Sequence, residues 1–75
     1  MTDRIIKQIE FIKEIDKMKN ILRMTLVSES ERRENDAEHS WHLAMMAMLL
    51  EEYSDKPVDI SHVLKMTLVH DLVEI

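Results

Sequence analysis

The chain contains no glycine and a single proline, Pro57, and this constrains its fold more than any other feature of the sequence. Tight hairpin turns usually rely on glycine, often after asparagine, because glycine adopts positive φ angles at little cost. Methionine, leucine, isoleucine, glutamate and lysine, which all favour helices, are abundant instead. The composition therefore predicts an all-α fold with about three helices.

The length of 75 residues allows one small domain at most. A domain of this size buries only about 60 % of the surface that its unfolded chain exposes, so it needs extra stabilisation. The chain has no cysteine, which excludes disulfides and zinc–thiolate sites. The remaining sources of stability are a metal ion held by histidine and carboxylate, a partner chain, or a further part of the same protein.

Charge and hydropathy exclude two classes of partner. The formal net charge is −5, whereas nucleic-acid binders normally carry a basic patch. The longest apolar run, residues 43–50, is far shorter than the roughly 20 residues of a membrane-spanning helix. We therefore expect no nucleic-acid partner and no membrane span. The lack of cysteine fits a cytoplasmic protein.

Periodic apolar residues predict the first helix over residues 3–26, with charged side chains on its other face. Residues 28–35 contain no apolar side chain, so we expect a solvated loop there. Asn35 or Asp36 is a suitable N-cap for a second helix, which should run to Tyr53.

Pro57 disfavours helix in the residue before it, so the second helix should end ahead of the Ser54–Pro57 segment. Asp59 is then the expected N-cap of a third helix. Its apolar pattern continues to Ile75 without a helix stop signal.

The adjacent pair His70 and Asp71 is the first candidate for chemistry, because it interrupts an otherwise apolar run. A histidine beside an ionised aspartate is costly to bury unless the two are paired or bound to a metal ion. Glu74 follows His70 by four residues and Asp71 by three, so a continuous helix would place it on the same side. There it could orient a water or support a metal ligand.

His39 lies near the start of the second helix, on the face that Leu43 and Met46 continue. If the second and third helices pack antiparallel, the start of one meets the end of the other. His39 would then reach the same end of the pair as His70 and Asp71. Two imidazoles and one carboxylate suit a divalent transition metal (Mn, Co, Fe, Ni or Zn) better than Mg or Ca, which prefer oxygen ligands.

These residues also have structural interpretations. A lone histidine on an apolar face is more often a hydrogen-bonded core residue, and an aspartate beside a histidine can be a simple ion pair. The combination favours a site over either interpretation alone. Four further residues are better explained by structural roles, although His42 could share a metal ion and the three arginines could attract a phosphate: Arg23, Arg32, Arg33 and His42. His62 is expected to be exposed or related to the helix cap.

Two stretches resemble the HD-domain metal-dependent phosphohydrolases, and among them the branch of 5'-deoxynucleotidases and oxetanocin-biosynthesis-like proteins. Residues 32–40 are similar to a Glu-Asn-x-x-Glu-His-Ser block, and residues 68–74 to a His-Asp-x-x-Glu block. The resemblance implies that His39, His70 and Asp71 are metal ligands and that Glu74 activates or positions the attacking water. It also implies that Arg23 contacts the substrate phosphate.

The same resemblance implies hydrolysis of (deoxy)nucleoside 5'-monophosphates by a helical HD bundle that forms homodimers. The family domain is longer, and a later aspartate completes its metal shell. We therefore expect residues 1–75 to be the N-terminal part of an HD domain, inactive by itself. Two alternatives remain: a non-catalytic HD-like regulatory or interaction module, and an HD hydrolase of cyclic nucleotides, ppGpp or deoxynucleoside triphosphates.

Overall fold

The computed structural model describes residues 2–75 and is mainly helical, as predicted. A small antiparallel sheet of two strands is added to the helices. The elements in chain order are α1 (Thr2–Ile15), a 3-10 turn (Asp16–Asn20), β1 (Leu22–Leu26), β2 (Arg33–Asn35), α2 (Asp36–Leu50), a 3-10 turn (Glu51–Tyr53), α3 (Ile60–Val69) and a 3-10 turn (Leu72–Glu74).

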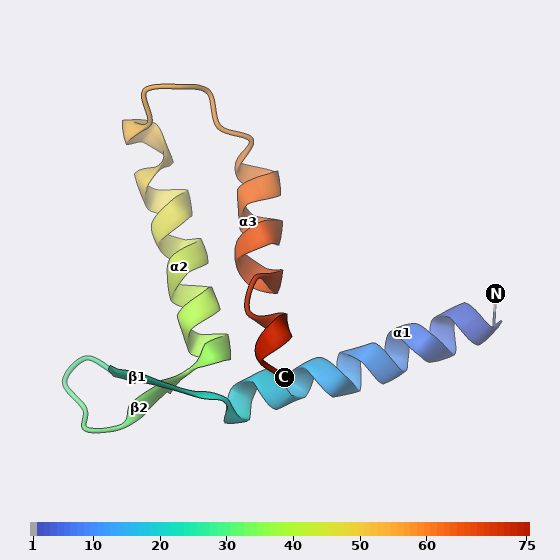
Figure 1. Ribbon diagram of the computed structural model, residues 1–75. Helices are drawn as coiled ribbons and strands as arrows, with labels where there is room; N and C mark the ends of the chain where they lie inside the picture. The colour runs from blue at the N-terminus through green and yellow to red at the C-terminus, as the bar shows by residue number, and fades with distance from the viewer. Residues whose placement is uncertain (1) are drawn as a thin grey trace.

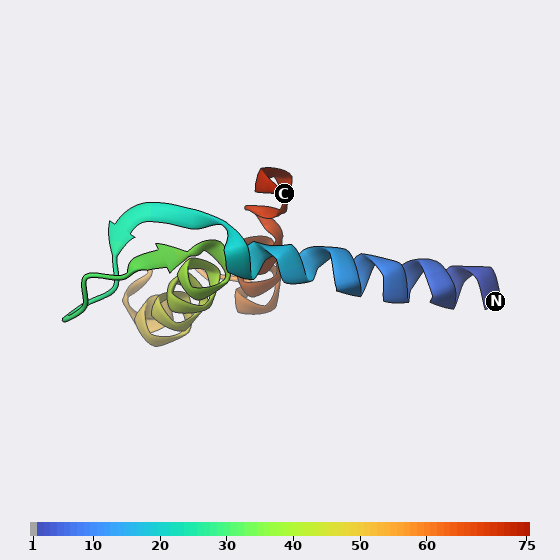
Figure 2. The same cartoon turned by 90° about the horizontal axis from the view of Figure 1, so that it is seen from below.

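Helices α2 and α3 lie side by side and run antiparallel, with the β1–β2 hairpin at the start of α2 (Figure 1). Helix α1 extends away from this assembly as an arm in both views (Figures 1 and 2). No residue of α1 is buried, and its apolar side chains Ile5, Ile9 and Ile12 are about half exposed. Among the described residues, Met18 is the buried apolar residue, so the chain has little core of its own.

The prediction of a continuous helix over residues 3–26 is wrong in its last part. Helix α1 ends at Ile15, and residues 22–26 form β1. Leu22, Met24 and Leu26 alternate with polar residues, which is a strand pattern that the helical interpretation overrode. The strand is held by a distant residue, because Arg33 Nε donates to the Arg23 carbonyl at 2.7 Å.

The expected loop over residues 28–35 is a loop only in its first part, because Arg33–Asn35 forms β2. The two strands pair Leu22 with Asn35 and Leu26 with Arg33, with an irregularity between these pairs. The turn between them includes Glu29 at φ 61, in the left-handed region that favours glycine. The absence of glycine therefore did not exclude a hairpin, since this chain places a strained glutamate in the turn.

The start of α2 is fixed by a capping box, in agreement with the predicted N-cap. The Asn35 side chain accepts from the Glu38 amide at 2.9 Å, and Glu38 Oε1 accepts from the Asn35 amide at 3.0 Å. Arg32 donates to both Glu38 carboxylate oxygens at 2.7 Å. The Asp36 amide also donates to the Ile21 carbonyl at 2.8 Å, which ties this helix end to the segment before β1.

Helix α3 begins as predicted, with the Asp59 side chain accepting from the His62 amide at 3.2 Å. Its predicted extension to Ile75 is wrong, because the α-helix ends at Val69. His70 Nδ1 donates a hydrogen bond to the Thr67 carbonyl oxygen at 2.5 Å. The next residue, Asp71, has the non-helical backbone angles φ −98 and ψ 6. The helical spacing from which Glu74 was placed beside His70 therefore does not exist.

Within residues 2–75, none of the helices combines the length and the hydropathy that crossing a membrane requires.

The Arg32–Glu38 pair predicts an acid-sensitive contribution to stability. The hydrogen bond from Arg32, followed by that from the Asn35 amide, lowers the pKa of Glu38 from 4.5 to about 2. Because the folded-state pKa is depressed, this contribution is complete above the unfolded value and is lost as pH falls through the folded value. We expect the stability difference between wild type and Glu38→Gln to shrink between pH 4.5 and about 2.

Urea unfolding of both proteins across this range measures that difference directly. Glu31→Gln, which changes an exposed carboxylate in the turn of the same hairpin, is the matched control. A difference between wild type and Glu38→Gln that stays constant with pH would contradict the prediction.

Candidate metal centre

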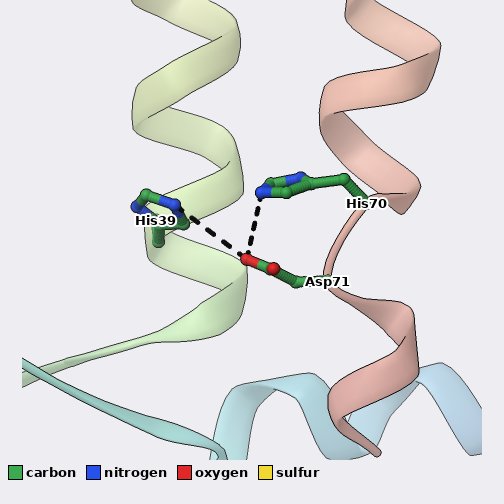
Figure 3. Close-up of side chains that lie close together, drawn as sticks. All are labelled: His39, His70 and Asp71. Atoms are coloured by element: carbon green, nitrogen blue, oxygen red, sulfur yellow. Dashed lines mark ion pairs between the residues drawn. The ribbon is translucent and has the colours of Figure 1, made fainter.

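The antiparallel packing of α2 and α3 brings together the three side chains that the sequence singled out as metal ligands. His39 comes from α2, and His70 and Asp71 follow the end of α3 (Figure 3). Each offers one ligand atom, and these atoms lie within 4.8 Å of one another. Asp71 Oδ2 is 3.2 Å from His70 Nε2 and 3.9 Å from His39 Nε2.

Asp71 Oδ2 is a buried carboxylate oxygen without a hydrogen-bond partner among the described residues. Its contacts with the two imidazoles are close enough for ion pairs but are not aligned as hydrogen bonds. An unsatisfied buried carboxylate oxygen costs free energy, so such a group usually has a role that supplies its partner. A cation between the three side chains would satisfy it.

The hydrogen bond of His70 fixes which of its nitrogens can bind an ion. A carbonyl oxygen only accepts, so the contact between the Thr67 carbonyl and His70 Nδ1 requires the proton on Nδ1. The lone pair is then on Nε2, the nitrogen that faces Asp71. Metal-binding histidines are commonly oriented by such a backbone or carboxylate partner on the other nitrogen.

The spacing of these atoms fits a single transition-metal ion. Metal bonds of about 2.0–2.2 Å place the ligand atoms of one ion roughly 3–4 Å apart. The separations of 3.2 and 3.9 Å from Asp71 Oδ2 fall in this range. Small side-chain rotations would bring the two histidine nitrogens, which lie within 4.8 Å of each other, into the same range. Three protein ligands leave positions open for water or substrate.

A polar pocket of about 370 Å³ adjoins Asp71 and contains two more of the predicted site residues, Arg23 and Glu74. Arg23 was expected on a helix, but it lies on β1, where it is less exposed than its neighbours Leu22 and Met24. Glu74 reaches the pocket through the 3-10 turn after Asp71, and not through the helical spacing from which it was placed there.

Two carboxylates at this site were missed by the sequence interpretation. Glu34 Oε1 lies 3.3 Å from Arg23 Nε and 3.5 Å from His39 Nδ1. Asp36 is only 3 % exposed, lines the polar pocket, and has one oxygen without a hydrogen-bond partner among the described residues. Their position within a few residues of His39 was the available signal. It was not used because Glu34 was assigned to a solvated loop and Asp36 was considered only as a possible N-cap.

The weaker candidates have structural roles in this arrangement. His42 stacks beside Trp41, with ring centroids 6.4 Å apart, and stays outside the histidine–aspartate cluster. Arg32 is paired with Glu38, and Arg33 donates to the carbonyl groups of β1. A second pocket of about 380 Å³ beside Trp41 is mostly apolar and contains none of the three candidate ligands, so we connect the chemistry with the polar pocket.

Comparison with known proteins identifies the family of this chain. A family profile for the HD domain matches residues 15–75. The crystal structure of a predicted metal-dependent phosphohydrolase from Magnetospirillum magnetotacticum MS-1 is 59 % identical and superposes with a TM-score of 0.88. The match covers 95 % of this chain but 36 % of that protein, so this chain spans about a third of its length. No curated protein matches this chain.

The cluster predicts that single substitutions will weaken binding of a divalent transition metal. Asp71→Asn and His70→Ala should each lower the affinity for Mn²⁺ or Zn²⁺ by at least about tenfold, since even groups that only support metal ligands are typically worth about 10–100-fold. Isothermal titration of the full-length protein measures this. His42→Ala should bind as wild type does, and equal affinity in all four proteins would exclude the cluster as the metal site.

Proposed function

This chain belongs to the HD-domain family, and from that premise we propose that it carries part of the active site of a metal-dependent phosphohydrolase. One observation supports this most directly. His39, His70 and Asp71 converge, and Asp71 lines a polar pocket together with Arg23 and Glu74. The crystal structure described as a predicted metal-dependent phosphohydrolase is consistent with it.

In this proposal His39, His70 and Asp71 hold a divalent transition metal (Mn, Co, Fe, Ni or Zn). When bound, such an ion polarises a phosphoryl oxygen and lowers the pKa of a coordinated water. Arg23 orients the substrate phosphate through charge-assisted hydrogen bonds. Glu74 accepts a proton from the attacking water as it adds to phosphorus, and the bond from phosphorus to the leaving oxygen breaks while that oxygen takes up a proton from solvent.

The charges around the pocket support a requirement for a cation. Asp36, Asp71 and Glu74 contribute three formal negative charges and Arg23 one positive charge, which leaves a balance of −2. A phosphate group would be repelled by this lining, and a divalent cation would cancel the excess. The pocket is therefore suited to a phosphate only together with the metal ion.

We propose (deoxy)nucleoside 5'-monophosphates as substrates, with nucleoside and inorganic phosphate as products. The basis is the similarity of the Glu34–Ser40 and His70–Glu74 blocks to the 5'-deoxynucleotidase branch. The pocket of about 370 Å³, with one guanidinium facing carboxylates, accommodates a single phosphate and part of a sugar. We further propose that residues 1–75 act as the N-terminal part of an HD domain in the cytoplasm.

A substrate panel tests the reaction. Full-length protein with Mn²⁺ or Co²⁺ should release phosphate from nucleoside 5'-monophosphates, and a chelator should abolish the release. Glu74→Gln should lower kcat by about 100-fold or more because it removes a general base. Arg23→Lys should mainly raise KM because the two-pronged phosphate contact is lost. His42→Ala is the control expected to match wild type.

Other outcomes of the same panel would redirect the proposal. Release only from cyclic nucleotides, ppGpp or deoxynucleoside triphosphates would replace the substrate. Tight metal binding without hydrolysis of any of these compounds would favour the non-catalytic HD-like module.

We also propose that the protein is a homodimer in which the arm α1 is covered. Its isoleucines are exposed along one side, and a continuous apolar stripe of this kind is usually buried against another surface. Analytical ultracentrifugation of the full-length protein should show a dimer at micromolar concentration. A monomer at all concentrations would contradict this assembly.

A further inference from the structure

Glu34 lies between the two halves of the site and is joined to both. It is the residue before the N-cap Asn35, and its side chain is 16 % exposed. A single carboxylate oxygen, Oε1, faces Arg23 Nε at 3.3 Å on one side and His39 Nδ1 at 3.5 Å on the other. One side chain therefore contacts both the guanidinium of the pocket and a candidate metal ligand.

The contact with His39 bears on which nitrogen can bind a metal ion. His39 faces Asp71 through Nε2, so metal binding requires the proton on Nδ1. A carboxylate only accepts hydrogen bonds, so Glu34 favours the form of His39 that carries this proton. The distance of 3.5 Å is long for a hydrogen bond, and a small side-chain rotation would bring it into range.

His70 provides an internal comparison. Its Nδ1 is already held by the Thr67 carbonyl, a fixed acceptor of the backbone. Among residues 2–75, Glu34 is the residue that offers an acceptor near Nδ1 of His39. The backbone of α3 thus determines which nitrogen of His70 carries the proton. For His39, the position of the proton depends on the side chain of Glu34 in the hairpin.

The contact with Arg23 bears on the phosphate. Glu34 lies on the Nε side of the guanidinium, while Nη1 is 4.0 Å from Asp36 at the polar pocket. Arginine binds phosphate through two parallel N–H groups. A carboxylate that pairs with Nε therefore orients the N–H groups of the two terminal nitrogens. Glu34 therefore restrains the group that would meet a phosphate.

We propose that Glu34 is a positioning residue that links the metal ligand His39 to the phosphate-binding Arg23 through one carboxylate oxygen. The part that concerns Arg23 rests on the proposed function, and the part that concerns His39 rests on the metal cluster alone. The two parts can be separated because glutamine keeps an oxygen that accepts from His39 but lacks the charge that holds Arg23.

Nuclear magnetic resonance of metal-free, full-length protein with ¹⁵N-labelled histidine tests the first part. Spectra are recorded at alkaline pH, and His39→Gln identifies the His39 signals. Wild type and Glu34→Gln should carry the His39 proton on Nδ1, and Glu34→Ala should lose this preference. The Zn²⁺ affinity should fall about 10–100-fold in Glu34→Ala and far less in Glu34→Gln.

Titration of the Zn²⁺-loaded protein with inorganic phosphate tests the second part without requiring turnover. Glu34→Gln should bind phosphate about tenfold more weakly than wild type, because the neutral amide no longer forms the ion pair that orients the Arg23 guanidinium toward phosphate. Glu31→Ala, which removes an exposed carboxylate from the same hairpin, should change neither the histidine spectrum nor the two affinities.

An unchanged His39 proton position and Zn²⁺ affinity in Glu34→Ala would overturn the proposal. If that variant fails to fold, the phosphate affinity of Glu34→Gln decides instead, and a wild-type value overturns the link to Arg23. A different set of results is expected if the protein is not a nucleotide phosphohydrolase. Wild type would then hydrolyse no nucleotide, while the effects of Glu34 on His39 and on Zn²⁺ affinity would persist.

Discussion

The packing of α2 against α3 is the contact on which the candidate site depends. His39 lies in the first turn of one helix, and His70 and Asp71 follow the last turn of the other. Only an antiparallel arrangement puts these ends together (Figure 1). The segment between Tyr53 and Ile60 reverses the chain and makes this arrangement possible. Two helix ends, each held by its own hydrogen bonds, thus bring the three candidate metal ligands together.

The hairpin contributes the other half of the site. Its strand β1 places Arg23 at the polar pocket, and its strand β2 places Glu34 between Arg23 and His39. It is joined to α2 without a linker, because Asn35 ends β2 and caps the helix. The bond from Asp36 to the Ile21 carbonyl adds a second tie. His39 and Arg23 therefore lie on parts of the chain that are joined directly by the cap and by this hydrogen bond.

Electrostatics connects the two halves. The pocket contains more carboxylates than cations, and Asp71 keeps an unsatisfied buried oxygen. Both features cost free energy in the chain alone, and both are relieved by a divalent cation. In the function that we propose, the cation would therefore bind before the phosphate. That order follows from the charges of the side chains.

Local chemistry was sufficient for much of this structure. The helical class and the caps Asn35 and Asp59 follow from residue types and spacings within short stretches. The candidate ligands His39, His70 and Asp71 could be named from residue types, but their grouping also needed the assumption that two helices pack antiparallel. A capping bond involves neighbours three residues apart, so the sequence determines it directly.

Tertiary contacts decided the remainder. Residues 22–26 could have continued a helix, and they form a strand because Arg33 and β2 lie beside them. Helix α3 ends at Val69, where the side chain of His70 takes the Thr67 carbonyl, so Glu74 reaches the pocket by a different route from the one expected. The roles of Glu34 and Asp36 depend on Arg23, which lies more than ten positions before either. Spacing along the chain does not encode such pairings, because they exist only once distant segments have packed together.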